Sequence, residues 1–346
     1  WDAEEFFPAD TLKKMGDLGL MGVYLPDEYG GSGFGYFEYV TTLIEIGRVC
    51  GGVGLSVAAH NSLCLGHIYY HGTEAQKKKY LPKLASGEWI GAWGLTEPNT
   101  GSDAMRMKAT ATKDGDDWII NGSKTWITHG LSGDVIVVLV RTGELLDSKG
   151  ITAFILEKDM PGLSAVKIKD KLGVRASETA ELIFDNVRVP KENMILGMGR
   201  GFEVAQGRLG PGRIHHCMRS IGLAEAALKL LCERAVSREA FGRPLAKLGG
   251  NVDIIADARI NIEMTRLLCL KAAWLMDNVG TDAAQPFISM IKVAAPNMAL
   301  KIIDEAMQMH GGIVISDDTP LAGWYGAQRT LRFADGPDAV HRMVIG

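Results

Sequence analysis

From residue 201 to its end, the chain carries two long apolar stripes at the spacing of an α-helix, and this pattern constrains the fold most. Helices with such apolar faces must pack against one another, which predicts an antiparallel helical bundle. The first stripe comprises Ile214, Met218, Ile221, Leu228, Leu231 and Ala235, and the second comprises Ile288, Ile291, Ala295, Met298 and Ile302.

The segment before these stripes has a different pattern. Between residues 92 and 200, strand-like runs such as DVIVVLVRT, ITAFILEKD and AELIFDNVRVP alternate with turns, and Asn121-Gly122 has the composition of a hairpin turn. Residues 1–91 instead combine helical periodicity with glycines. The sequence therefore predicts an α+β multi-domain protein, with an N-terminal helical domain over 1–91, a middle β domain over 92–200 and a C-terminal four-helix bundle over 201–346.

Composition excludes several classes of protein. The chain has 37 basic and 41 acidic side chains among 346 residues, a formal net charge of -4, and no Lys/Arg block, which argues against a nucleic-acid partner. No apolar run approaches the roughly 20 residues that cross a bilayer, so no membrane span is expected. Five widely spaced cysteines without a C-x-x-C pair indicate reduced thiols.

Two common kinds of site find little support. His67 and His71 are four residues apart, but Ile68 stands where a metalloprotease H-E-x-x-H motif needs its glutamate, and the other histidines show no ligand spacing. No metal site is therefore predicted. The glycine clusters GGSGFGYF and GMGRGF do not follow a strand as G-x-G-x-x-G, which argues against a nicotinamide dinucleotide site.

Two neighbouring segments could instead bind a ligand with a phosphate and a planar ring. WGLTEPNTGSDAMRMKATA, residues 93–111, offers the hydroxyls of Thr96 and Ser102, and Gly101 lets backbone amides approach a phosphate. In TWITHG, residues 125–130, the side chains of Trp126 and Thr128 are two apart and share a strand face. A capped turn and an ordinary β core explain the same residues equally simply.

A single carboxylate lies near the end of the chain, in the Ala-Asp-Gly-Pro turn of LRFADGPDAVHR, residues 331–342. Asp335 is either a turn former or a functional acid, and the turn composition alone favours the turn former.

Six motifs in order resemble the acyl-CoA dehydrogenase family of flavoproteins over essentially the whole chain. These are TEPNTGSD at 96–103, WIT at 126–128, KLGVRASETAELIFDNVRVP at 171–190, SREAFGRPL at 237–245, QMHGG at 308–312 and the terminal Asp-Gly turn. The first half is similar to short-chain members. The second half is similar to the subgroup with a terminal Ala-Asp-Gly-Pro loop, including phosphotransferase-fused members.

The resemblance implies an FAD site and a homo-oligomer, usually a tetramer, because a neighbouring subunit supplies part of that site. The cofactor-binding residues that it implies are Trp93, Leu95, Thr96, Gly101, Ser102, Trp126, Thr128, Arg238, Phe241, Gln308, Gly311 and Gly312. Gly249 departs from a glutamine that often contacts the neighbouring FAD.

For the substrate, the resemblance implies an acyl-CoA bound by Ser102, Ser177, Gly210, Arg213 and Gly336. Family members carry their catalytic base at the terminal turn or on the bundle helix before the arginine matched by Arg213. That helix position is Gly212, and the nearest carboxylates along the chain are Glu203 and Glu225. Asp335 is thus the expected base.

The implied reaction is α,β-dehydrogenation to a trans-2-enoyl-CoA, with electrons passed to an electron-transfer flavoprotein, as in β-oxidation of fatty acids. A nitroalkane-oxidase-like flavin oxidase and a non-catalytic acyl-CoA-binding or assembly protein are the alternatives. The resemblance implies the cytoplasm in a bacterium and the mitochondrial matrix in a eukaryote. Tyr69 and Tyr70 favour a short acyl chain.

Overall fold

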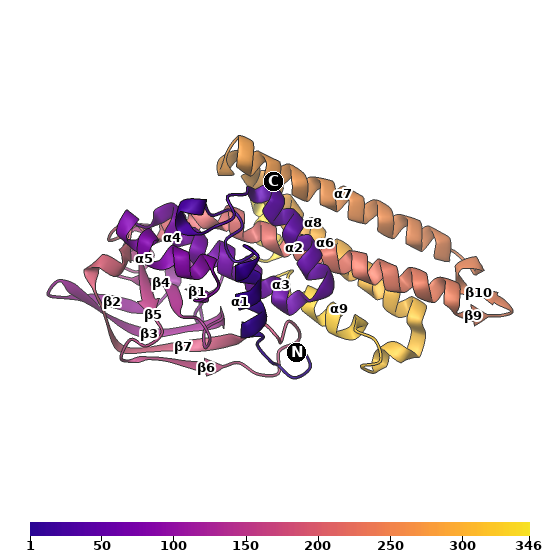
Figure 1. Cartoon of the computed structure of the whole chain (residues 1–346), viewed down its shortest axis with the longest axis horizontal. Coiled ribbons are helices and arrows are strands. Elements are labelled where there is room, and N and C mark those ends of the chain that lie inside the picture. The colour runs from indigo at the N-terminus through magenta and orange to yellow at the C-terminus, as the bar shows by residue number, and fades with distance from the viewer. The chain divides into compact units, whose positions relative to one another are not determined.

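The computed structural model describes Trp1–Gly346, apart from the side chains of residues 207–211 (Figure 1). The chain divides into two compact units. The first unit contains residues 1–35, 56–171 and 175–212, and the second contains residues 36–55, 172–174 and 213–346. The predicted domain bounds at residues 91 and 200 stay a prediction.

Short helices and an eight-stranded sheet make up the first unit. Its helical segments are α1 (Ala9–Asp17), the end of α3 (Gly51–Ala59), a π-helical stretch (His60–Leu65), α4 (Gly66–His71), α5 (Glu74–Ala85) and the start of α6 (Gly201–Ser237). A capping box begins α5, because the Thr73 hydroxyl accepts from the Gln76 backbone N–H and the Gln76 side chain accepts from the Thr73 N–H.

The sheet has the order β6-β7-β3-β2-β4-β5-β8, and β1 pairs with β4 in parallel. Its core lies around β4 and β5, in which nearly every side chain is buried, as in a strand covered on both faces. The strands are β1 (Gly91–Gly94), β2 (Thr110–Asp114), β3 (Asp117–Thr128), β4 (Val135–Arg141), β5 (Ile151–Glu157), β6 (Leu163–Lys167), β7 (Thr179–Val189) and β8 (Met194–Ile195).

The predicted hairpin at Asn121-Gly122 is wrong. β3 runs straight through these residues, and its hairpin with β2 turns at Gly115-Asp116 instead. Gly122 marks a register irregularity between β3 and β7, with a φ of 129°. A Cβ at this position would lie 2.7 Å from the Ala109 backbone, so the glycine permits a close backbone approach rather than a turn.

Two fully buried histidines fix strand β1. The Gly91 N–H donates to His60 Nδ1 at 3.0 Å, so the neutral ring carries its proton on Nε2, which donates to the Leu84 carbonyl at 2.9 Å. His129 Nδ1 donates to the Gly91 carbonyl at 3.0 Å. Burial lowers the pKa of His60 to about 3 and that of His129 to about 4, so both rings are neutral at neutral pH.

These histidines predict an acid-sensitive fold. Because their pKa values are lower in the folded chain than the ordinary 6.5, the unfolded chain binds more protons below that pH, and stability falls as pH falls. We expect the free energy of unfolding to fall by about 2 kcal/mol for each histidine when the pH is lowered from about 7 to about 5. Urea unfolding at the two pH values measures this. An unfolding free energy that stays constant would contradict neutral burial of the rings.

Helices dominate the second unit (Figure 1). They are α2 (Tyr36–Val49), the start of α3, most of α6, α7 (Asn251–Asn278), α8 (Thr281–His310), α9 (Leu321–Thr330) and α10 (Asp338–Ile345), with a short hairpin of β9 (Glu239–Ala240) and β10 (Arg243–Pro244). α8 packs against α7, α9 and α10. Every residue of the two predicted apolar stripes is buried, which confirms both stripes.

One helical stretch, Thr281–Ile315, is long and apolar enough to cross a membrane by length and composition. The sequence prediction concerned uninterrupted apolar runs, and this helix has none of that length because polar residues are scattered along it. Just over half of its most apolar window is buried inside the protein. Burial against α7, α9 and α10 is what a core helix of a bundle shows.

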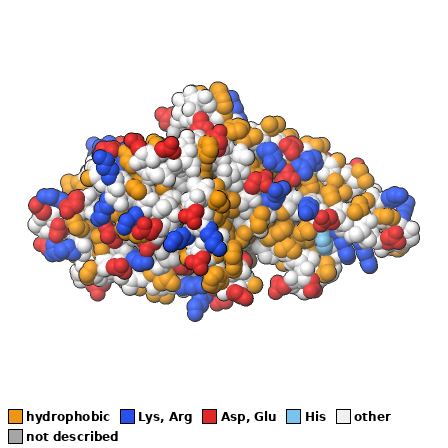
Figure 2. All heavy atoms as spheres, in the orientation of Figure 1, with side chains coloured by type: hydrophobic (Ala, Val, Ile, Leu, Met, Phe, Trp, Pro, Cys, Tyr) orange, Lys and Arg blue, Asp and Glu red, His pale blue; other side chains and the backbone are white. Residues whose placement is uncertain are grey.

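The surface carries both signs of charge, consistent with the nearly balanced composition. Over the face that Figure 2 shows, blue and red side chains are interspersed, with orange hydrophobic side chains between them. All five cysteines lie in the described part of the chain and are free thiols, as the sequence predicted.

Candidate functional site

The terminal turn that carries Asp335 joins α9 to α10 in the second unit. Asp335 adopts a left-handed backbone conformation, with a φ of 54°, which aspartate and asparagine tolerate better than most residues. Lys292 Nζ, on α8, donates to the Leu331 carbonyl at 2.6 Å and to the Gly336 carbonyl at 3.2 Å. A buried cation thus holds the turn by its backbone.

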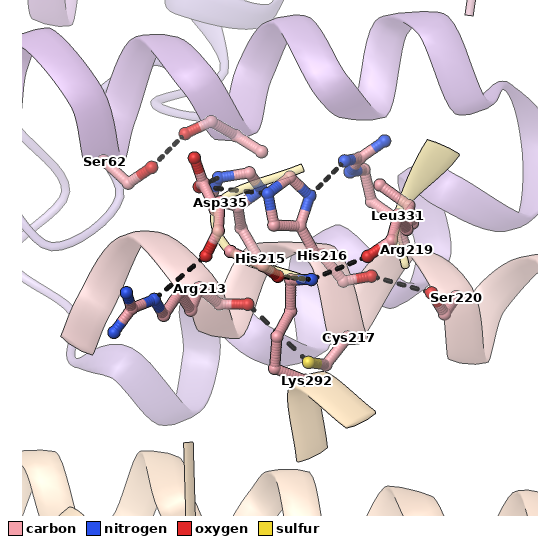
Figure 3. Close-up of polar contacts among 12 residues, drawn as sticks. Ser62, Arg213, His215, His216, Cys217, Arg219, Ser220, Lys292, Leu331 and Asp335 are labelled. Carbon is pink, nitrogen blue, oxygen red and sulfur yellow. Dashed lines mark hydrogen bonds and ion pairs between the residues drawn. The ribbon is translucent and has the colours of Figure 1, made fainter. Parts of the chain in front are cut away.

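Two further donors contact the Asp335 carbonyl. Arg213 Nε on α6 donates to it at 3.1 Å, and His341 Nε2 on α10 lies 3.3 Å away. The Asp335 side chain meets α6 as well, because His216 Nε2 lies 3.0 Å from Asp335 Oδ2 (Figure 3). Arg219 Nη2 in turn lies 2.9 Å from His216 Nδ1. Helix α6 therefore presents three side chains to the turn and its partners.

Around Asp335, the buried His216 and His341 are neutral at neutral pH, while the neighbouring arginine and lysine side chains are positively charged. Burial lowers the pKa of His216 to about 4, and burial together with nearby Arg213 and Lys292 lowers the pKa of His341 to about 4. Burial also lowers the pKa of Arg219 to about 10 and that of Lys292 below its ordinary value. At neutral pH the half-buried Asp335 thus lies near positive charges and neutral rings.

His215, His216 and Asp335 offer ligand atoms within 4.8 Å of one another, a grouping that could hold a metal ion. The spacing of the histidines did not predict this grouping, because Asp335 lies more than a hundred residues further along the chain. Arg219 argues against a metal here. Since a guanidinium only donates, His216 Nδ1 accepts from it, and the ring turns an N–H rather than a lone pair toward Asp335.

The helix position proposed for an alternative base offers no acid. Gly212 has no side chain, and Glu203 pairs with Arg200 at 2.6 Å. Glu225 accepts from Arg259 at 2.7 Å and from Arg266. Both nearest α6 carboxylates are thus paired with arginines, and the role of Asp335 as the base stays a prediction. Gly210, a predicted substrate-binding residue, lies outside the described residues.

A second set of predicted residues lies in the first unit, where β1 continues into the loop of residues 95–103. Trp93 is buried and stacks on His67, with ring centroids 3.8 Å apart, while Leu95 and Thr96 are half-buried. The Thr125 N–H donates to the Thr96 carbonyl at 2.8 Å. This bond places the loop beside the end of β3 and its WIT segment.

A buried ion pair fixes the same loop. Glu97 Oε1 lies 2.7 Å from Lys124 Nζ, and Lys124 also donates to the Leu95 carbonyl at 3.1 Å. The Glu97 carboxylate accepts the backbone N–H groups of Lys108 at 2.6 Å and Ala109 at 2.9 Å. Burial lowers the pKa of Lys124 to about 8, with Glu97 opposing the shift. Gly101 and Ser102 follow at the exposed tip of the loop.

Trp126 is 61% exposed, an unusual state for so large an aromatic ring. The prediction that it shares a face with Thr128 assumed a regular strand. The ladder with β7 shifts register between Lys124 and Ile127, and Trp126 itself has a φ of 61°. Its exposure thus comes from this bulge, and the common face with the half-buried Thr128 stays a prediction.

Ser177 is fully buried in the first unit. Within the described residues, its hydroxyl has no hydrogen-bond partner, while its carbonyl accepts from Lys171 Nζ. A buried hydroxyl without a partner is rare, which is compatible with the predicted contact to a ligand.

The remaining predicted cofactor residues lie at the surface of the second unit. Phe241 and Gly242 form the two-residue turn between β9 and β10, both with positive φ, as a type I′ hairpin requires. The Phe241 side chain is 95% exposed at this tip. Arg238 precedes it, and Gln308, Gly311 and Gly312 stand at the end of α8; all four are exposed.

Three family descriptions match almost the whole chain. The N-terminal domain of acyl-CoA dehydrogenases matches residues 1–88, the middle domain matches 92–187 and the C-terminal domain matches 199–346. The chain belongs to the acyl-CoA dehydrogenase family. This confirms the family, fold class and enzyme class that the six ordered motifs predicted.

Individual relatives agree with this membership. The short-chain specific acyl-CoA dehydrogenase of Clostridium acetobutylicum is 40% identical, over 99% of this chain and 90% of the relative. The butyryl-CoA dehydrogenase of Megasphaera elsdenii has a TM-score of 0.95 at 36% identity, and the match covers 100% of this chain and 91% of that chain.

Two further solved structures are similar to this chain over almost its whole length. A structure reported for the electron transferring flavoprotein of Acidaminococcus fermentans has a TM-score of 0.96 at 38% identity, covering 99% of this chain and 90% of that chain. A glutaryl-CoA dehydrogenase of Mycobacterium smegmatis, in complex with FADH2, has a TM-score of 0.93 at 31% identity, covering 99% and 87%.

Sequence reasoning missed most of the partners of Asp335. His216, Arg219, Lys292 and His341 had no predicted role. A signal for the first two was present, because Arg213, His216 and Arg219 recur every three residues and so lie close together along one side of a helix. Lys292 stands out equally, as a lysine inside a strongly apolar helix.

Proposed function

We propose that this chain catalyses the α,β-dehydrogenation of a short acyl-CoA to its trans-2-enoyl-CoA, with Asp335 as the base. The observation that carries the proposal is the terminal turn. Its carboxylate is half-buried and lies 3.0 Å from His216 Nε2, while the alternative position, Gly212, bears no acid. Family membership supplies the reaction class.

Proton abstraction needs a base in hydrogen-bond reach of the substrate and a donor for the charge that develops on the thioester carbonyl. An alkyl C–H beside a thioester is a very weak acid, so both are required. Asp335 takes the proton, and its backbone N–H is the proposed carbonyl donor. Ser102, Ser177, Gly210, Arg213 and Gly336 are the proposed contacts of the acyl-CoA.

The first unit has features that suit FAD. Trp126 is a large exposed ring beside a polar loop whose tip, Gly101-Ser102, leaves room for an approaching phosphate, since a Cβ at Gly101 would meet nothing within 4 Å. The proposed contacts are Trp93, Leu95, Thr96, Gly101, Ser102, Trp126 and Thr128, with Arg238, Phe241, Gln308, Gly311 and Gly312 from a neighbouring subunit. When bound, the flavin accepts the hydride from the β-carbon.

Substitution of Phe241 tests this shared site. A ring that is 95% exposed gains little in the isolated chain, so its place at a hairpin tip suits contact with a ligand or a second subunit. We expect Phe241→Ala to weaken FAD binding about tenfold or more and to weaken assembly. The variant loses about 1 kcal/mol of stacking energy in addition to the free energy of burying the ring.

FAD retention after gel filtration and the oligomeric mass measure this outcome. Leu18→Ala is the control, since Leu18 is 75% exposed in α1's C-cap and has no proposed contact. A Phe241→Ala monomer that keeps its FAD at the parent affinity would refute the shared site.

Five finer features belong to the same proposal. The partner that removes the electrons is an electron-transfer flavoprotein, and the active form is a homotetramer. A short acyl chain is supported by the names of the relatives and by Tyr69 and Tyr70, which contact Tyr29 and Tyr24 with ring centroids 6.2 and 6.4 Å apart. The compartment is the cytoplasm in a bacterium and the mitochondrial matrix in a eukaryote, with a role in β-oxidation.

The purified protein decides between this reaction and a nitroalkane oxidation. Acyl-CoAs of about four to about ten carbons are added without oxygen while the flavin spectrum is recorded, and the CoA product is identified by mass spectrometry. We expect bleaching and an enoyl-CoA, fastest with short chains. Rapid oxygen uptake with nitroethane, without bleaching by any acyl-CoA, would favour the oxidase.

A further inference from the structure

Asp335 is held through its side chain by a chain of two buried residues on α6. Arg219 contacts His216 at 2.9 Å, and His216 contacts Asp335 Oδ2 at 3.0 Å (Figure 3). His216 and Arg219 are 4% and 3% exposed, so both contacts are made away from bulk water. All three residues belong to the second unit.

The direction of these hydrogen bonds follows from what each group can do. A guanidinium has donors and no acceptor, so His216 Nδ1 must accept from Arg219 and cannot carry a proton. A neutral imidazole has one N–H, and here it lies on Nε2. His216 Nε2 therefore donates to Asp335 Oδ2. Burial, which lowers the pKa of His216 to about 4, keeps the ring in this form at neutral pH.

We infer that Arg219 selects the His216 tautomer that donates to Asp335, and that the two act as positioning residues for proton abstraction. This inference rests on the proposed role of Asp335 as the base. Arg213 and His341 contact the Asp335 carbonyl and Lys292 contacts the Gly336 carbonyl, whereas His216 contacts the Asp335 carboxylate itself.

A neutral donor suits a base better than a cation would. An imidazolium beside Asp335 would stabilise the carboxylate by its full charge and make it a poorer proton acceptor. A neutral N–H orients the same oxygen at a smaller cost in basicity. Aspartate is one methylene shorter than glutamate, so the orientation of its carboxylate decides whether it reaches the substrate carbon.

Other titratable groups lie near His216 and Asp335 and influence how this pair responds to pH. His215 Nε2 lies 3.8 Å from Asp335 Oδ2, and Cys217 lies one residue beyond His216 on α6. The charged or titratable groups that influence the cluster from α2, α6, α8 and α10 are Tyr39, Arg213, His215, Cys217, Arg219, Lys292, Asp338 and His341.

Three variants test the inference by single-turnover flavin reduction under nitrogen, with butyryl-CoA as the probe. His216→Phe removes the donor, and we expect the rate to fall roughly 10- to 100-fold with FAD content and substrate affinity within a few-fold of the parent. His216→Gln places an amide N–H near the former Nε2 and is expected to recover much of the rate. Ser220→Ala is the control, because Ser220 lies one turn away and bonds Gln328 and the His216 carbonyl.

Arg219→Met supplies a readout that a purely structural role would not move. Loss of Arg219 removes one influence that lowers the pKa of His216, and it frees Nδ1 to take a proton. In both proteins we expect the rate of flavin reduction to fall as the solution becomes more acidic. In Arg219→Met this fall should begin at a higher pH than in the parent. The double variant Arg219→Met/His216→Gln should not show this difference from the parent. If His216→Phe does not fold, the pH profile of Arg219→Met still tests the positioning role of His216 and Arg219.

The outcomes separate this inference from the proposed function. If no acyl-CoA reduces the parent flavin, the proposed function fails. If the parent is reduced and Asp335→Asn is inactive, while His216→Phe stays within twofold or so of the parent and the pH profile of Arg219→Met is unshifted, the positioning role alone is wrong.

Discussion

Asp335→Asn is expected to slow flavin reduction by acyl-CoA about 10²-fold or more while leaving FAD bound, because it removes the proposed base and keeps its shape. Asparagine tolerates the left-handed backbone at this turn as well as aspartate does, so the turn itself should persist. It can also accept from His216 through its amide oxygen. Stopped-flow absorbance under nitrogen measures the rate.

Asp335→Glu is the matched control for the carboxylate. It restores an acid, with one extra methylene and a side chain less suited to positive φ, so we expect measurable activity below that of the parent. Chain-length preference should change with it. If Asp335→Asn reduces its flavin within a few-fold of the parent rate, Asp335 is a turn residue and the proton is taken elsewhere.

Lys124→Met is expected to lower the free energy of unfolding by about 3 to 5 kcal/mol, because it leaves the buried Glu97 carboxylate without its cation. Lys124 is fully buried and Glu97 is 7% exposed, so water cannot replace the lost contact. FAD should also bind more weakly, since Lys124 holds the Leu95 carbonyl in the proposed flavin loop. Urea unfolding and FAD titration measure the two effects.

An exposed ion pair in the same unit provides the comparison. Arg188→Met removes contacts to Asp114 and Asp117 on the surface and should cost no more than about 1 kcal/mol. Lys124→Met/Glu97→Gln removes both buried charges and should lose less than the two single variants together. A loss below about 1 kcal/mol in Lys124→Met would mean that the carboxylate does not need this lysine.

The helical and strand patterns were predictable because they are local. The stripe that contains Ile214 and Met218 is buried as its spacing predicts, and so is the stripe that contains Ile288 and Ile291. The hairpin predicted at Asn121-Gly122 was wrong because the same two residues also occur where a glycine allows a close backbone approach. The contact with Ala109 that distinguishes them comes from a neighbouring strand.

The surroundings of Asp335 were not predictable from sequence. His216 is 119 positions away along the chain, and Lys292 is 44 positions from Gly336. Their convergence depends on how α6, α8 and the terminal turn pack. The proposed role of Asp335 came from a resemblance, and Gly212 was eliminated as an acid because it has no side chain.

The most direct test of the account is hydrogen exchange at the substrate α-carbon. An acyl-CoA whose β-carbon is replaced by sulfur cannot lose a β-hydride, so exchange of its α-hydrogens in deuterium oxide reports proton abstraction alone. With both proteins saturated, the parent is expected to exchange these hydrogens at least about 10² times faster than Asp335→Asn. Equal exchange by the two proteins would contradict the assignment of Asp335 as the base.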